Sequence, residues 1–168
     1  MIVVKKATPE HVEGISRVCT EAFWATYQGI YSREHIERVN REFYNHKRIL
    51  SEVTETTREW NGYYVALDDD TVVGAIGGGM IDEHVSEVFV LYLDLKRRRE
   101  GIGTLLLDAL TEVQQEKGAN EQWVSVAKGN QKGIPFYEAK GFVKQSERSS
   151  YGNTSDENYI SIRYCRKI

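Results

Sequence analysis

The residues whose types and spacing could do chemistry lie between positions 96 and 104. A basic run, "KRRR" at 96–99, passes through "EGIGT" at 100–104 into an apolar stretch with helical spacing. The first turn of a helix has unpaired N–H groups and a partial positive charge, and glycines allow a ligand to approach the backbone closely. Arginines beside such a turn add charge and hydrogen-bond donors. The segment therefore predicts a cradle for a phosphate or pyrophosphate group.

Two other interpretations of this segment stay open on the residues alone. Any tight strand-to-helix turn could use two glycines without binding a ligand. A nucleic-acid patch is disfavoured, because the chain has a net charge of −3 and proteins that bind a nucleic-acid backbone are usually basic. The spacing also lacks the Gly-x-Gly-x-x-Gly pattern of a dinucleotide site. We therefore expect no nucleic-acid partner.

The composition describes a chain that can bury a core and remain in solution. Its 168 residues, 40% hydrophobic and 28% charged, predict a single domain over residues 1–168. Cys19 and Cys165 have no metal-ligand spacing and are expected to be reduced thiols. The N-terminus lacks the pattern of a secretion signal, and no apolar run approaches the roughly 20 residues of a membrane helix. We expect a cytoplasmic protein with no membrane partner and no metal.

The chemical groups need a scaffold, and hydrophobic periodicity outlines one. Helices are expected at 8–27, 32–53, 101–118 and 136–141, with Thr8 and Ser32 as N-caps and Gly118 as a stop. Strands are expected at 2–7, 84–95, 121–127, 142–150 and 158–167, and a hairpin at 62–81 that turns at Asp68-Asp69-Asp70. Three glycines at 77–79 indicate a bulge or a close approach by another group. This order predicts an α/β fold, a mixed sheet with helices on its faces.

Two segments resemble the Gcn5-related N-acetyltransferase (GNAT) superfamily. "RREGIG" at 98–103 matches its Gln/Arg-x-x-Gly-x-Gly/Ala signature, and "NQKGIPFYEAKGF" at 130–142 resembles its Asn…Phe-Tyr-x-x-x-Gly-Phe block. The order of elements also resembles the family fold over nearly the whole chain. The resemblance implies a mostly antiparallel central sheet whose central strands splay apart. Leu95 and Arg99 depart from the pattern, since many members have proline and glycine there.

The resemblance implies acetyl transfer from acetyl-coenzyme A (acetyl-CoA) to an amine. The pantetheine arm would add to the open edge of the fourth strand, where the Leu93 backbone should bond it. The Leu91 N–H should point at the thioester carbonyl, where negative charge develops. Asn130 matches a position that bonds the pantetheine or phosphate region, with a helix N-cap as its alternative. The amides expected to hold the pyrophosphate are those of Arg98, Arg99, Glu100, Gly101, Ile102, Gly103 and Thr104.

Acetyl transfer also needs an acid, because the leaving thiolate must be stabilised and finally protonated. Tyr137 matches the family tyrosine in this role, since a phenol can donate its proton. Its alternative role is packing against the sheet. Phe136 is expected to belong to the core.

The attacking amine must in turn lose a proton to a base. Glu87 is the candidate, because its position relative to Gly101 resembles that of the glutamate base in histone-acetylating members. Period-two alternation also predicts that Glu87 shares a face with Leu91 and Leu93. A surface ion pair is its alternative role. Three other candidates for the base remain: Glu83, His84 and water.

The acceptor side is weakly defined in the sequence. The resemblance implies that the first two helices and the loop between the last two strands shape it. Trp24, Tyr27 and Tyr31 could line a pocket there or pack in the core, and Asp156 and Glu157 could attract a cation or be solvated. The acceptor is expected to be a primary amine of a small molecule or of a protein or peptide. A non-catalytic acetyl-CoA sensor is the alternative function, and a homodimer is an open option.

Overall fold

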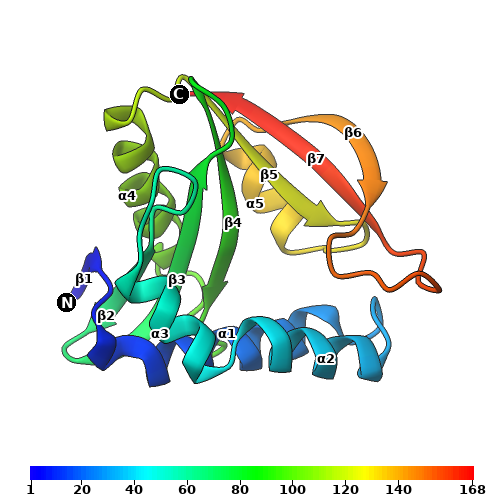
Figure 1. Ribbon diagram of the computed structural model, residues 1–168, viewed down its shortest axis with the longest axis horizontal. Helices are drawn as coiled ribbons and strands as arrows, with labels where there is room; N and C mark the ends of the chain where they lie inside the picture. The colour runs from blue at the N-terminus through cyan, green and yellow to red at the C-terminus, as the bar shows by residue number, and fades with distance from the viewer.

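All seven strands form one sheet in the computed structural model, which describes residues 1–168 (Figure 1). The strand order is β1-β2-β3-β4-β5-β7-β6, and β4 and β5 are the one parallel pair among these strands. The strands are β1 (Ile2–Lys6), β2 (Tyr63–Asp68), β3 (Thr71–Met80), β4 (Val85–Leu93), β5 (Glu121–Ala127), β6 (Val143–Ser149) and β7 (Ile160–Lys167). The helices are α1 (Val12–Tyr27), α2 (Arg33–Phe43), α3 (His46–Thr54), α4 (Ile102–Glu116) and α5 (Gly133–Ala139), and a 3-10 turn at Pro9–His11 precedes α1.

The expected fold class, a mixed and mostly antiparallel sheet flanked by helices, is confirmed. Two elements differ from those expected: α5 begins at Gly133, before the expected start at 136, and the helical region expected over 32–53 is two helices with a break at residues 44–45. Asn45 explains the break, since its side-chain oxygen accepts the Arg48 N–H at 2.8 Å and starts a new helix. Ser32 caps α2 as predicted, accepting the His35 N–H at 3.1 Å. None of the helices has the length and apolar character that a membrane crossing requires.

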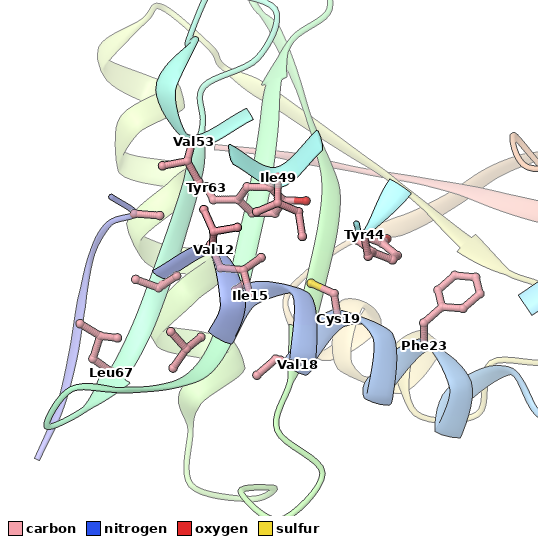
Figure 2. Close-up of a cluster of buried hydrophobic side chains, with 14 of the residues drawn as sticks. Val12, Ile15, Val18, Cys19, Phe23, Tyr44, Ile49, Val53, Tyr63 and Leu67 are labelled. Carbon is pink, nitrogen blue, oxygen red and sulfur yellow. The ribbon is translucent and has the colours of Figure 1, made fainter. Parts of the chain in front are cut away.

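A first hydrophobic core lies between α1–α3 and one face of β2–β4 (Figure 2). Helix α1 contributes an apolar stripe that includes Ile15, Val18 and Cys19, and α3 contributes Ile49. The recurrence of these residues every three or four positions in α1 is what directs one side of the helix to the sheet. Figure 2 shows this stripe facing Tyr63 from β2.

A second core lies on the other face of the sheet. Helix α4 inserts Leu106, Leu107 and Leu110, all fully buried, against β2–β5. Tyr137 from α5 and Phe142 beyond it complete this core. The sheet is thus held between two helical layers, and β4 is packed on both faces.

The pairing of β4 with β5 is short. It runs from Val85 opposite Glu121 to Val88 opposite Val124, and beyond these residues the two strands diverge, as Figure 1 shows. The splay expected for the central strands is therefore present. Beyond Val88, the edge of β4 that faces β5 has no strand partner.

A β-bulge lies beside the last of these pairs. On β3, Gly78 pairs with Val88 and Gly77 pairs with Val90, so Phe89 is an extra residue in β4. A bulge shifts side chains that follow it to the opposite face of the sheet. Val90 accordingly packs in the core of α1–α3, whereas Val88 and Leu91 both pack in the core of α4 and α5.

The bulge overturns one prediction about the candidate base. Glu87 precedes the extra residue, so its side chain lies on the α1 side of the sheet. Leu91 and Leu93 follow it and lie on the α4 side. The prediction that all three share a face is wrong, because simple alternation assumes an unbroken ladder.

For the three glycines of β3, the sequence indicated either a bulge or a close approach by another group. Both are present, because the bulge lies opposite these glycines and other groups approach them closely. A Cβ atom on Gly77 would collide with the Trp60 ring. A Cβ atom on Gly78 would collide with the Glu87 carbonyl oxygen, and one on Gly79 with the Glu59 carbonyl. The missing side chains thus permit close backbone approach on both faces of β3.

The loop that connects β6 and β7 is fastened to α2 by one carboxylate. Glu157 accepts hydrogen bonds from Arg38 at 2.8 Å, from the Thr154 N–H at 2.8 Å, and lies 2.9 Å from Nδ1 of the buried His35. Arg38 also donates to the Gly152 carbonyl at 2.6 Å. Burial alone would raise the pKa of Glu157, but the hydrogen bonds from Thr154, Arg38 and His35 hold it down at about 2.

Gly79→Ala tests the close approach at β3. The added methyl group would overlap the backbone carbonyl of Glu59, which cannot rotate away as a side chain can. We expect the free energy of unfolding to fall by about 3 kcal/mol, the upper part of the usual range for overpacking. Gly152→Ala is the control, because its nearest neighbour is a Val39 methyl group at 3.3 Å. Denaturant unfolding measures both variants, and equal stability of the two would contradict the packing described above.

Glu157→Gln tests the attachment of the β6–β7 loop. A folded-state pKa below the usual value contributes stability that is present above about pH 4.5 and is lost as the pH falls toward 2. The variant should therefore melt about 4 °C below the wild type at pH 7. The gap should narrow steadily between pH 4.5 and pH 2.5. Glu37→Gln, which breaks an exposed pair with Arg33, should change the melting temperature little at any pH.

Candidate functional site

A cleft of about 200 Å³ opens where β4 and β5 diverge. Its walls are the segments 88–93 of β4 and 124–126 of β5, and residues of α1 and α5 close it at the sides. Six of the residues expected to bind the cosubstrate or to supply the acid line this one cleft: Leu91, Leu93, Arg98, Gly103, Asn130 and Tyr137. Leu91 and Tyr137, 46 positions apart in the chain, are thus brought together by the splay.

The loop before α4 has the geometry of an anion cradle. Gly101 has a φ of 79° and precedes the first residue of the helix, with open space where a side chain would be. Arg99 adopts a φ of 66°, a left-handed conformation that residues other than glycine rarely adopt. This strained position is the one where many GNAT members have glycine. Arg98 lines the cleft, so it is the arginine of the run that faces a ligand there.

The other residues of the basic run have structural roles or remain outside the cleft. Arg97 donates to Asp68 at 2.8 Å and to both oxygens of Glu100 at 2.8 and 2.9 Å. These bonds tie the cradle loop to the end of β2. Ile102 is buried in the core of α4 and α5. Glu100 and Ile102 can therefore contribute to a phosphate site through their backbone but not through their side chains.

The phenol of Tyr137 reaches the cleft from α5, and the residue is 8% exposed. Burial, with a smaller contribution from Tyr27, raises the pKa of Tyr137. The hydroxyl therefore carries its proton at neutral pH, as a hydrogen-bond donor or acid must. Phe136 packs edge-on against Tyr137 with ring centroids 5.2 Å apart.

Glu87 is held by a buried guanidinium group. Arg163 of β7 donates to its two oxygens at 2.7 and 2.9 Å, and Arg163 also donates to Ser125 at 2.8 Å. The Arg163 guanidinium lies over the Trp123 ring, 5.0 Å from its centroid. Glu87 is 7% exposed and directly precedes the cleft wall that starts at Val88. Its carboxylate is thus fixed in an ion pair with Arg163 at the closed end of the splay.

The other base candidates lie away from the cleft. His84 and Glu83 are exposed in the turn before β4, and His84 Nδ1 lies 3.0 Å from the Gly118 carbonyl at the far end of α4. Neither residue lines the cleft. Asn130 lines the cleft, and its side chain accepts the Gly133 N–H at 2.9 Å at the start of α5, the capping role considered for it. Its bond to the cosubstrate stays a prediction.

Two residues of the site were not predicted from the sequence. These are Arg163, the partner of Glu87, and Tyr92, which lines the cleft. Tyr92 and Tyr27 both line the cleft. Period-two alternation through the bulge would have assigned Tyr92 to the wrong face. Arg163 had no motif around it, and only the antiparallel register of β7 with β5 brings it near Glu87.

The aromatic residues expected near the acceptor side form a packed row. Tyr27 stacks on Tyr31 with ring centroids 4.8 Å apart, and Tyr31 meets Tyr159 of the β6–β7 loop edge-on at 4.6 Å. Of this row, Tyr27 lines the cleft. Trp24 packs against the first core, Glu157 is fastened to α2, and Asp156 is exposed.

These features together describe a site for a long molecule with an anionic end. The open edge of β4 offers backbone N–H and C=O groups along the cleft, and Arg98 and the start of α4 offer positive potential at its mouth. Tyr137 can donate a proton from one wall, and Glu87 lies beside the closed end. Such a site suits the pantetheine arm and pyrophosphate of CoA.

Comparison with known proteins agrees with this geometry. The family model of the acetyltransferase (GNAT) family matches residues 18–142. Spermidine N(1)-acetyltransferase of Thermoplasma acidophilum is 30% identical over 152 residues, which cover 89% of this chain and 94% of that protein. The ribosomal protein bS18-alanine N-acetyltransferase of Escherichia coli is 30% identical over 82 residues, which cover 49% of this chain and 54% of that protein.

A solved structure shares the fold closely. The PaiA N-acetyltransferase of Thermoplasma acidophilum, in complex with coenzyme A, superposes with a TM-score of 0.82 at 27% identity and covers 97% of this chain and 98% of that one. The chain therefore belongs to the GNAT family and is an acetyl-CoA-dependent N-acetyltransferase.

Proposed function

We propose that the acceptor is a primary amine of a small linear polyamine, with spermidine as the first compound to test. The observation that carries this proposal is the extent of the match to the spermidine N(1)-acetyltransferase, which covers 89% of this chain. A match of that length leaves only about a tenth of this chain outside it. The match to the bS18-alanine enzyme covers 49% of the chain and gives less support for a protein N-terminus as acceptor.

The charge distribution supports a cationic acceptor. The chain carries a net charge of −3, and the Glu87 carboxylate is held in place beside the end of the cleft. Because Arg163 neutralises the Glu87 carboxylate, the attraction for a protonated amine comes from the net negative charge of the chain rather than from this residue. Phe89 and Tyr27 add aromatic surface to the cleft, over which an ammonium group is attracted.

In this proposal acetyl-CoA supplies the acetyl group, and the chain positions it. The Leu93 backbone bonds the pantetheine arm, and the Leu91 N–H donates to the thioester oxygen as negative charge develops on it. Arg98 and the amides from Arg99 to Thr104 hold the pyrophosphate, and Asn130 bonds the arm from the opposite wall. The support for this arrangement is that β4 has no strand partner along these residues.

Proton transfer completes the reaction. The amine nitrogen forms a bond to the acetyl carbon, the carbon–sulfur bond breaks, and the thiolate takes a proton from Tyr137. Glu87 accepts the proton that the amine releases. Because Glu87 lies behind the cleft wall with Arg163 on both oxygens, a water molecule carries the proton to a remaining lone pair of the carboxylate.

The proposed acceptor is tested with a panel of amines. Thiol release from acetyl-CoA should be measured with spermidine, spermine, ethanolamine and a short peptide that begins with the N-terminal alanine of bS18. We expect kcat/KM for spermidine to exceed that for the peptide by roughly 10²-fold, because recognition of a second ammonium group adds to binding in the transition state. Preference for the peptide, or turnover of none of these amines, would refute the polyamine assignment.

Tyr137→Phe tests the acid. The ring and its packing remain, but the proton donor is lost, so kcat should fall by roughly 10²-fold. The dissociation constant of CoA, measured by calorimetry, should change less than about twofold, because in this proposal the hydroxyl acts mainly on the leaving thiolate. Tyr164→Phe, which removes a phenol from the buried side of β7, is the matched control and should retain full activity. A Tyr137→Phe enzyme as active as this control would assign Tyr137 to packing.

A further inference from the structure

Two glutamines are completely buried in the core beneath the cleft. Gln114 of α4 and Gln122 of β5 both have an exposed fraction of 0%. A buried amide costs free energy unless each of its donors and acceptors finds a partner. Glutamine at such positions therefore has to be explained by the groups that it contacts.

Gln114 bonds three separate parts of the fold. Its Nε2 donates to the backbone carbonyl of Glu87 on β4 at 3.0 Å and to Oδ1 of the buried Asn61 at 3.4 Å. Its Oε1 accepts from Nε2 of Gln122 on β5 at 2.9 Å. One side chain of α4 thus holds both β4 and β5, the two strands that border the cleft.

Gln122 extends these bonds to β7. Its Nε2 also donates to Oγ1 of Thr111 at 3.0 Å, and its Oε1 accepts from Nε of Arg166 at 3.0 Å. Arg166 in turn donates to Thr111 at 3.0 Å and to the Lys140 carbonyl at 2.9 Å. Neither glutamine has a buried polar atom without a partner. Every member is satisfied in this one arrangement, and partial satisfaction would be costly.

This network lies at the point where the sheet divides. Gln122 pairs with Ser86 across the β4–β5 ladder, two residues before the final pair of Val88 and Val124. The bulge at Phe89 and the cleft both follow directly. A Cβ atom on Gly78 would collide with the Glu87 carbonyl and lie 2.9 Å from Nε2 of Gln114, so glycine is needed for the two to meet.

We propose that Gln114 is a positioning residue that fixes the angle at which β4 and β5 diverge, and hence the width of the cleft that receives the pantetheine arm. An apolar side chain of similar size would fill the space but would leave the Glu87 carbonyl, Asn61 and Gln122 without their partner. The strands would then relax to satisfy those groups in another way. The inference rests on the proposed course of the arm through the cleft and not on the identity of the acceptor amine.

Gln114→Met tests the inference with binding measurements alone. The variant keeps the length of the side chain and removes its hydrogen bonds. Two ligands are titrated calorimetrically: CoA, which has the pantetheine arm, and adenosine 3′,5′-bisphosphate, which lacks it. We expect the dissociation constant of CoA to rise about 10-fold, a change that corresponds to the net contribution of roughly one to two hydrogen bonds. The dissociation constant of the bisphosphate should change less than about twofold.

Two further variants separate positioning from stability. Ile49→Val removes a buried methylene group from the first core, on the other face of the sheet, and should leave both dissociation constants unchanged although it lowers the melting temperature. Gln114→Glu keeps the shape of the side chain but lacks its hydrogen-bond donor when the carboxyl group is ionised. Arg166, the cation of the network, bonds Gln122 and not residue 114, so it does not pair directly with the new carboxylate. Its CoA affinity relative to wild type should therefore recover as the pH falls from about 8.5 to 6, when the carboxyl group regains a proton to donate.

Three results would overturn the proposal. One is an unchanged CoA affinity in Gln114→Met. Another is an equal loss for CoA and the bisphosphate, which would indicate a general loss of structure. A third result applies if Gln114→Met does not fold. In that case, a CoA affinity of Gln114→Glu relative to wild type that does not change with pH would decide against the proposal. Equal affinity of the wild-type protein for the two ligands would instead contradict the premise that the pantetheine arm binds in the cleft. This outcome does not depend on which amine the enzyme acetylates.

Discussion

Beyond Val88, strand β4 lies in the middle of the sheet with no neighbour on its β5 side. Backbone N–H and C=O groups in such a place require partners, and a central strand cannot rely on bulk water as an outer strand does. The rest of the molecule can be understood from this unfilled position. The two helical layers hold β4 on both faces, the network of Gln114 and Gln122 anchors the place where the strands part, and the start of α4 faces the mouth of the cleft. A ligand that offers amide groups along its length completes the ladder.

The bulge at Phe89 gives the two halves of β4 different tasks. Before it, Glu87 directs its carboxylate to the α1 side, where Arg163 and Trp123 hold it. After it, Leu91 packs against α4 while its backbone borders the cleft. A single inserted residue therefore places the Glu87 carboxylate on one face of the sheet and the Leu91 side chain on the other, and it does so without any special side chain at the bulge.

Much of this arrangement could be predicted from the sequence, because it depends on local signals. The glycines and arginines before α4 and the order of strands and helices follow from spacing and periodicity, whereas the tyrosine of α5 was identified by the resemblance of its segment to the family motif. The face on which Glu87 lies could not, because a bulge is a property of two strands and the glycines of β3 indicated it only in general terms. The partnership of Glu87 with Arg163 depends on the register of β7, 76 positions away. The break at Asn45 was not predicted, because the helical pattern of the sequence continues on both sides of it.

Arg97 shows how little of a basic run can remain available as free charge. Its guanidinium is neutralised by Asp68 and Glu100, so the four cations at 96–99 present a smaller field than their number indicates. Electrostatic steering of a polyanion depends on the uncompensated charge near the site and weakens with ionic strength. Capture of the cosubstrate by this protein should therefore be governed less by long-range attraction, and be less sensitive to salt, than the sequence "KRRR" would lead one to expect.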